Sequence, residues 1–286
     1  MLTRNRLAAW MLLMIIGVVD WIWSRHAGLT FVGWPAFALW FGPVAFVGIF
    51  YEVSGRDQRL ANLGDQIALW LAFSAVGIIF TYDAASLRLP LRDADFAAID
   101  AALGFHWPQW SKLIGSHRLV ARPLTVAYFV LVPEIFLTVI YFAHIGRGDR
   151  NDEFLWMIMV SLVICTVLSA FFPAVGPCTY FFGVKPRFIQ HLLAVRAGTV
   201  KTFSLNAMEG IITWPSFHAV FAVVTPYVHR PPIRTFVPIT AVNILMLISI
   251  PTNGCHYLFD VLAGLVLAFT SILMVRGAFR IGWLRA

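Results

Sequence analysis

Two histidines and one carboxylate stand out in this chain because their spacing suits nucleophilic catalysis. His256 is followed four residues later by Asp260, and His218 comes two residues after Ser216. Residues four apart on a helix share a face, so the Asp260 carboxylate can accept the proton of one nitrogen of the His256 ring. That contact fixes the tautomer and leaves the other ring nitrogen free to attack an electrophile.

Both histidines are expected where an apolar helix begins. One further apolar run separates the runs at 216–229 and 256–275, so the two helices point the same way and the histidines lie on the same side. A helix start carries unpaired N–H groups and the positive end of the dipole, which favour an anion such as phosphate. We expect Phe217 at this phosphate site, while Ser216 either caps the helix or donates to a phosphate oxygen.

The composition is that of an integral membrane protein. Hydrophobic residues make up 60% of the 286 residues and charged residues 12%, and the mean hydropathy is +0.80. Soluble chains are closer to half apolar and roughly a quarter charged. The net charge of +7 comes from Lys and Arg residues scattered through short loops, which favours lipid headgroups over nucleic acid as partners.

Eight apolar runs are long enough, or nearly so, to cross a bilayer, which takes about 20 residues per helix. They predict an all-α polytopic membrane bundle, with two N-terminal transmembrane helices in residues 1–66 and a six-helix core in residues 67–286. Pro133 and Pro226 fall inside runs and are expected to kink those helices. The runs are 7–23, 31–51, 67–82, 123–145, 154–172, 216–229, 236–251 and 256–275.

The distribution of Lys and Arg predicts the orientation in the membrane. An even number of spans puts both termini on one side, and basic residues are denser in the loops of that side. The positive-inside rule then places both termini in the cytoplasm and the two histidines at the opposite face of what we expect to be a bacterial plasma membrane.

Two long segments lie on that opposite side. The first carries Phe96, Ile99 and Leu103 at helical spacing and predicts an amphipathic interfacial helix near 93–112. The second, about 173–215, leads into the run that carries His218 and is either a lid over the site or a plain connection.

The same side supplies the basic residues that a phosphate site needs. Glu209 precedes the first histidine and is expected to act at a helix start. Five basic candidates for phosphate binding are not ranked by the sequence: Arg122, Lys185, Arg187, Arg196 and Lys201.

The sequence favours neither a metal site nor a disulfide framework. Cys165, Cys178 and Cys255 have no metal-ligand spacing, although Cys178 and Cys255 share one side of the membrane and a bridge between them is the less favoured alternative. Two histidines with Asp260 could hold a metal ion, but no cysteine or second carboxylate supports that set. We therefore expect no metal and no cofactor.

At these residues the chain resembles the type 2 phosphatidic acid phosphatase superfamily. That family has a Pro-Ser-Gly-His block, a helical hairpin and then His-x-x-x-Asp, which correspond here to Pro215–His218 and His256–Asp260. The phenylalanine in the first block and the segments Thr252–Tyr257 and Phe172–Pro177 are closer to the branch of inositol phosphorylceramide synthases and, more distantly, sphingomyelin synthases. The resemblance covers roughly residues 120–275.

The resemblance implies a lipid phosphotransferase or phosphatase that needs no metal. His256 would be the nucleophile that forms a phosphohistidine, and Asp260 would orient it. His218 would protonate the leaving oxygen and then deprotonate the incoming alcohol or water. The partners would be membrane lipids: a lipid phosphate or phospholipid donor and, for transfer, a lipid or polyol acceptor. The branch favours transfer, and hydrolysis of a lipid phosphate or polyprenyl pyrophosphate is the alternative.

Two basic positions of the superfamily are not matched. Gly115 stands where the Lys-x6-Arg-Pro motif, matched at Arg122–Pro123, has lysine. Ile250 stands where the superfamily has an arginine six residues before the nucleophile. A lipid-binding or transport protein that keeps the fold without catalysis is therefore a further alternative.

Overall fold

The computed structural model describes residues 4–280 and Leu284. Within these residues the chain forms thirteen α-helices, one 3₁₀ helix and two short strands. The strands β1 (Thr30–Val32) and β2 (Thr202–Ser204) pair in parallel, and η1 (Leu205–Ala207) follows β2. The α-helices are α1 (Arg4–Ala27), α2 (Trp34–Ser54), α3 (Gln58–Ala85), α4 (Asp93–Ala102), α5 (Trp107–Ser116), α6 (Arg118–Phe129), α7 (Leu131–His144), α8 (Gly148–Phe171), α9 (Pro177–Phe182), α10 (Arg187–Ala197), α11 (Phe217–Val228), α12 (Phe236–Asn253) and α13 (Leu258–Arg280).

Seven of the eight predicted runs each correspond to one helix, and the run at 123–145 corresponds to two. Among the described residues, six helices are long and apolar enough to span a bilayer: α1, α2, α3, α8, α12 and α13. The run at 123–145 is the bent pair α6 and α7, and the run at 216–229 is α11, which has 12 residues. The all-α polytopic membrane bundle is therefore confirmed. The division between residues 66 and 67 stays a prediction and would fall inside α3.

Proline explains the break between α6 and α7. The two helices meet at Val130 with a bend of 51°. Pro133 has no N–H to donate to the Phe129 carbonyl, and its ring crowds that carbonyl, so a continuous helix cannot pass this point unbent. The kink predicted at Pro133 is thus present. Pro226 causes no comparable break because it lies in the last turn of α11.

The core is built around α8, which packs against α3, α11 and α13. Its residues Phe154, Met157 and Ile158 are fully buried. Beside it, α11 and α13 approach each other at Gly264, where an added Cβ would collide with the Ser216 carbonyl. The lack of a side chain at Gly264 therefore lets α11, which carries His218, touch α13, which begins two residues after His256.

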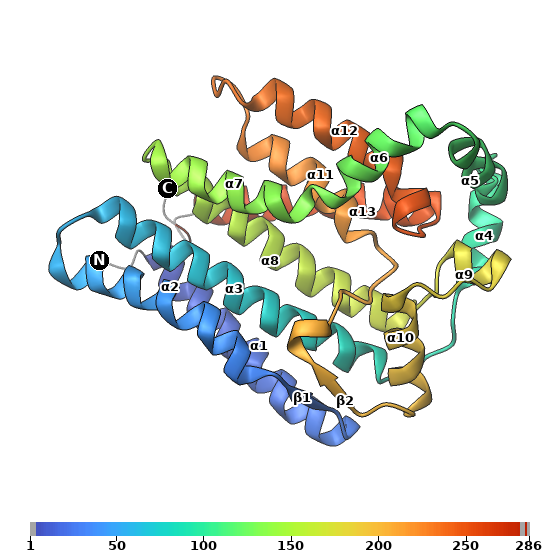
Figure 1. Cartoon of the computed structure of the whole chain (residues 1–286), viewed down its shortest axis with the longest axis horizontal. Helices are drawn as coiled ribbons and strands as arrows, with labels where there is room; N and C mark the ends of the chain where they lie inside the picture. The colour runs from blue at the N-terminus through green and yellow to red at the C-terminus, as the bar shows by residue number, and fades with distance from the viewer. Residues whose placement is uncertain (1–3, 281–283, 285–286) are drawn as a thin grey trace.

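The two ends of the bundle are built differently. At one end, Arg6 of α1 pairs with Asp65 of α3 at 3.4 Å and with Asp152 of α8 at 3.2 Å. Arg230, just after α11, pairs there with Glu153 of α8 at 2.9 Å. The short helices α4, α5, α9 and α10 and the strand pair lie at the other end, away from the N-terminus (Figure 1). The starts of α11 and α13 belong to this second end, since α13 begins against α4.

The predicted interfacial helix near 93–112 is two helices, α4 and α5. The buried face of α4 consists of Asp93, Phe96 and Asp100, whereas Ile99 and Leu103 are 36% and 54% exposed. The sequence predicted one apolar stripe of Phe96, Ile99 and Leu103, and this is wrong, because Phe96 faces the protein while the other two side chains are exposed. The buried face is mixed because its two carboxylates accept hydrogen bonds from backbone N–H groups, Asp93 from Val175 after α8 and Asp100 from Leu258 at the start of α13.

Candidate active site

The starts of α11 and α13 lie against each other. The Ser216 N–H donates to the Asp260 carbonyl at 3.0 Å. The Ser216 Oγ accepts the Ala219 N–H at 3.4 Å, so Ser216 is the N-cap of α11. Its side chain is completely buried and does not line the cavity described below. Of the two roles predicted for Ser216, the structure shows the capping contact.

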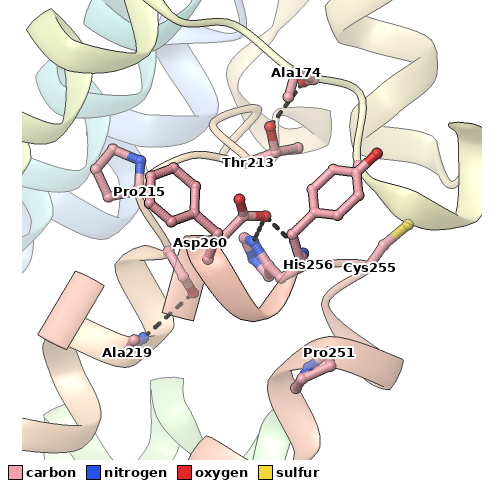
Figure 2. A network of polar contacts seen from close by, with 12 residues as sticks. Ala174, Thr213, Pro215, Ala219, Pro251, Cys255, His256 and Asp260 are labelled. Carbon is pink, nitrogen blue, oxygen red and sulfur yellow. Dashed lines mark hydrogen bonds and ion pairs between the residues drawn. The ribbon is translucent and has the colours of Figure 1, made fainter. Parts of the chain in front are cut away.

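His256 and Asp260 make the contact that their spacing predicts. The His256 Nδ1 lies 3.2 Å from the Asp260 Oδ2, and that oxygen also accepts the Tyr257 N–H at 2.9 Å (Figure 2). Both side chains are buried, Asp260 completely. A carboxylate in this place holds the ring proton on Nδ1 and leaves Nε2 with a free lone pair.

His218 and His256 line one cavity of about 640 Å³. Its wall is mainly apolar and comes largely from α3, α6, α7 and α11, which suits the acyl chains of a lipid. Tyr128 stacks on the His218 ring, with centroids 4.2 Å apart and planes at 12°. This stacking fixes the orientation of the second imidazole at the cavity wall.

One of the five basic candidates lines this cavity, namely Arg187 at the start of α10. Lys201 lines a separate cavity of about 300 Å³ beside α1 and α3. Arg196 donates to the Leu89 carbonyl at 2.6 Å, and neither Arg122 nor Lys185 lines the histidine cavity. Phe217, the other predicted phosphate-site residue, does line it.

Glu209 is placed differently from its prediction. It lies in the irregular segment between η1 and α11, not at a helix start, and it lines the histidine cavity. Its Oε1 lies 3.6 Å from the Arg187 Nε, and Arg187 also donates to the Ala207 carbonyl at 2.8 Å. Sequence patterning missed this because the fold of the 173–215 segment, which carries both charges, is not set by local spacing.

The two helix starts differ in their capacity to bind an anion. At α13 the Leu258 and Phe259 N–H groups donate to the Asp100 carboxylate at 2.9 and 2.8 Å. The predicted phosphate site at this helix start is therefore already filled by a protein carboxylate. At α11 the Phe217 and His218 N–H groups have no partner among the described residues, so this start remains open to phosphate oxygens.

Asp93 and Asp100 are buried carboxylates that the sequence reading passed over. Asp93 accepts the Gly176 N–H at 2.9 Å and the Tyr257 hydroxyl at 3.1 Å. Burial raises the pKa of both carboxyl groups, and this effect is larger than that of the hydrogen bonds, which lower the pKa. Their spacing of seven residues, two helical turns on one face, was the available signal.

Cys178 and Cys255 form a disulfide, with their Cα atoms 5.6 Å apart. The less favoured alternative of the sequence reading is thus the one present. Gly176, with φ +82°, permits the approach, because a Cβ there would collide with the Cys255 carbonyl. The bridge ties α9 to the residue directly before His256. Cys165 is free and buried.

Comparison with known proteins identifies the family. A family model of the PAP2 superfamily matches residues 94–274, which run from α4 into α13 and include both histidines and Asp260. The chain belongs to the PAP2 superfamily. No curated protein and no solved structure matches it. Membership in this superfamily makes the chain an integral membrane enzyme of the lipid phosphatase type.

Proposed function

We propose that this PAP2 protein is a lipid phosphotransferase that moves a phospho-headgroup from a phospholipid to an alcohol acceptor through a phosphohistidine. The observation that carries the proposal is one apolar cavity lined by His218 and His256, in which the His256 Nδ1 is held by Asp260. The pairing aims Nε2 as a nucleophile, and the second imidazole supplies acid–base chemistry beside it.

In the first step the His256 Nε2 lone pair attacks the phosphorus, and the bond from phosphorus to the lipid oxygen breaks. His218 donates its proton to that oxygen, so a neutral lipid alcohol leaves. Arg187 and the unpartnered N–H groups of Phe217 and His218 are the groups available to bind the phosphate oxygens as charge develops on them.

In the second step His218 takes the proton of the acceptor hydroxyl, whose oxygen attacks the phosphohistidine. The phosphorus–nitrogen bond then breaks, and both histidines return to their first state. With water as acceptor the same two steps give hydrolysis, because water and an alcohol each give up one proton to His218. The acceptor is therefore selected by the cavity and not by the catalytic groups.

The charge in the cavity favours a phosphodiester donor. Arg187 and Glu209 are its charged lining residues besides the histidines, and together they are neutral. Gly115 and Ile250 stand where the superfamily has lysine and arginine. A phosphodiester carries one negative charge, whereas a phosphomonoester or pyrophosphate carries about two or more and needs more positive groups around it. This reasoning supports the transferase branch over phosphatidic acid hydrolysis.

The site is proposed to face away from the cytoplasm, in a bacterial plasma membrane. The ion-paired end of the bundle holds Arg6, Arg150 and Arg230, which the positive-inside rule assigns to the cytoplasm. The histidines lie at the other end. The donor would then be drawn from the outer leaflet.

The proposal is tested with purified protein in detergent. The donors are fluorescent phosphodiester lipids, phosphatidic acid and a polyprenyl pyrophosphate, and each is assayed with and without an added lipid alcohol or polyol. We expect transfer from a phosphodiester, with His256→Ala and His218→Ala each at least about 10³-fold slower. His144→Ala, an exposed histidine at the other end, is the matched control. Product formed only with water identifies a phosphatase. No turnover of any lipid by folded protein, or full turnover by the two histidine variants, contradicts the catalytic assignment.

A further inference from the structure

Helix α4 packs against the segments that lead into α11 and α13, next to His218 and His256. Phe96 packs against Trp214, two residues before the cap of α11, with ring centroids 5.5 Å apart. The same ring packs against Tyr257 and Phe259 at the start of α13, at 6.1 and 5.3 Å. One short helix outside the membrane-spanning set therefore contacts both places from which the catalytic imidazoles emerge.

The Asp100 carboxylate caps α13 from this neighbouring helix. Each of its oxygens accepts one N–H, from Leu258 at 2.9 Å and from Phe259 at 2.8 Å, and the side chain is 2% exposed. A helix normally obtains this cap from the residue before its own first turn. Here the residues that precede Leu258 are His256 and Tyr257, so the cap is supplied by a residue 158 positions earlier.

The His256–Asp260 contact depends on this first turn. The Asp260 Oδ2 accepts both the Tyr257 N–H and the His256 Nδ1 proton, so the contact exists only while the backbone of residues 256–257 keeps its place against the first turn of α13. Asp93 gives α4 a second hydrogen bond to this segment, because it accepts the Tyr257 hydroxyl proton at 3.1 Å. Without the Asp100 carboxylate, the partly buried Leu258 and Phe259 N–H groups would lack a protein partner and would draw in water or an anion.

We propose that Asp100 is a positioning residue for the nucleophile His256. It holds the start of α13 through the Leu258 and Phe259 N–H groups, and it keeps substrate phosphate away from this start, so that phosphate binds at the start of α11. The catalytic half of this inference rests on the proposed function. The structural half, the capping of α13 in trans, does not.

The test compares Asp100→Ala and Asp100→Asn with Asp95→Ala, a change at an exposed carboxylate on the same helix. With a fluorescent phosphodiester lipid, Asp100→Ala is expected to lower kcat by about 10- to 100-fold with KM within about 3-fold, because binding is retained while the nucleophile is misaligned. Asp100→Asn keeps one acceptor oxygen and is expected to lie between Ala and the parent. Sodium formate, a small carboxylate, is expected to restore turnover of Asp100→Ala in a saturable way and to leave Asp95→Ala unchanged.

Hydrogen exchange read by mass spectrometry separates this inference from the proposed function. In the parent the amides of residues 257–259 are expected to exchange slowly. In Asp100→Ala they should exchange at least about 10-fold faster, and formate should slow them again. The inference is overturned if folded Asp100→Ala protein has the amide exchange rates of the parent, or the kcat of the parent. It is also overturned if the substitution changes KM and leaves kcat unchanged. If the unsubstituted protein cleaves no lipid, the proposed function is wrong, while the exchange data still decide whether Asp100 caps α13.

Discussion

Phosphate recognition at the scale of single residues rests on very few charges. Arg187 is the one Lys or Arg side chain among the described residues that line the cavity, and Glu209 and the Ala207 carbonyl hold its guanidinium from the side. These two contacts leave other N–H groups of the exposed guanidinium for a ligand. Both side chains are exposed, but Lys185, two residues earlier, lies outside the cavity, a difference that local spacing could not predict.

Replacing Arg187 with Gln removes that charge while keeping a polar side chain. The expected result is a fall in kcat/KM of about 10²-fold, the size found when one group that stabilises developing charge is deleted. Lys185→Gln makes the same change of charge nearby and should leave kcat/KM within about 2-fold, because Lys185 lies outside the cavity and solvent screens its charge from the phosphate. Initial rates with a fluorescent phosphodiester lipid measure both, and equal losses in the two variants would mean that Arg187 acts only through the general field.

What could be predicted at this scale depended on whether the relevant contact was local. The His256–Asp260 contact joins residues only four apart, so spacing could predict it, although His256 lies two residues before α13 and not on the helix itself as predicted. Arg187 could not be chosen among five candidates, because its place depends on the fold of the segment after α8. Asp100 was missed for the same reason, since its N–H donors lie 158 and 159 residues away.

At the scale of elements, the site exists because α11 and α13 touch. Gly264 provides the contact, and the Ser216 N–H bond to the Asp260 carbonyl at 3.0 Å locks the relative position of the two helix starts. Apolar periodicity predicted both helices and their common direction, but not this contact. The broken span α6–α7 was predictable from Pro133, whereas the split of α4 from α5 and the buried carboxylate face of α4 were not.

Gly264→Ala should separate these two helices. The new Cβ would collide with the Ser216 carbonyl and lie 2.8 Å from the Ala219 Cβ, so backbone must move to admit it. Overpacking of this kind costs about 1–3 kcal/mol, and we expect a lower midpoint of thermal unfolding in detergent together with loss of turnover. Gly277→Ala places the same methyl group on α13 where nothing lies within 4 Å, and it should change neither quantity. Equal unfolding midpoints and equal turnover in the two variants would show that α11 and α13 do not meet at Gly264.

The whole molecule has two ends with different tasks. One end is joined by ion pairs of Arg6 and Arg230 with carboxylates of α3 and α8. The other carries the site, the Cys178–Cys255 disulfide and the parallel pairing of β1 with β2, which connects the α1–α2 turn to the segment after α10. A disulfide at the site end agrees with the orientation predicted from Lys and Arg, because disulfides persist in the periplasm and are rare in the cytosol.

The cysteine inventory makes this orientation testable without a cysteine-free background. Cys178 and Cys255 are bridged and Cys165 is buried, so the parent should not react with a charged maleimide that cannot cross the plasma membrane. Lys185→Cys, in the exposed turn between α9 and α10, should be labelled in right-side-out spheroplasts, because the site end is proposed to face outwards. Arg234→Cys, between α11 and α12, should be labelled only after the membrane is permeabilised, since it lies beyond the far end of α11. The reverse pattern would put the histidines on the cytoplasmic face and the donor lipid in the inner leaflet, and reduced cysteines at 178 and 255 would then be expected as well.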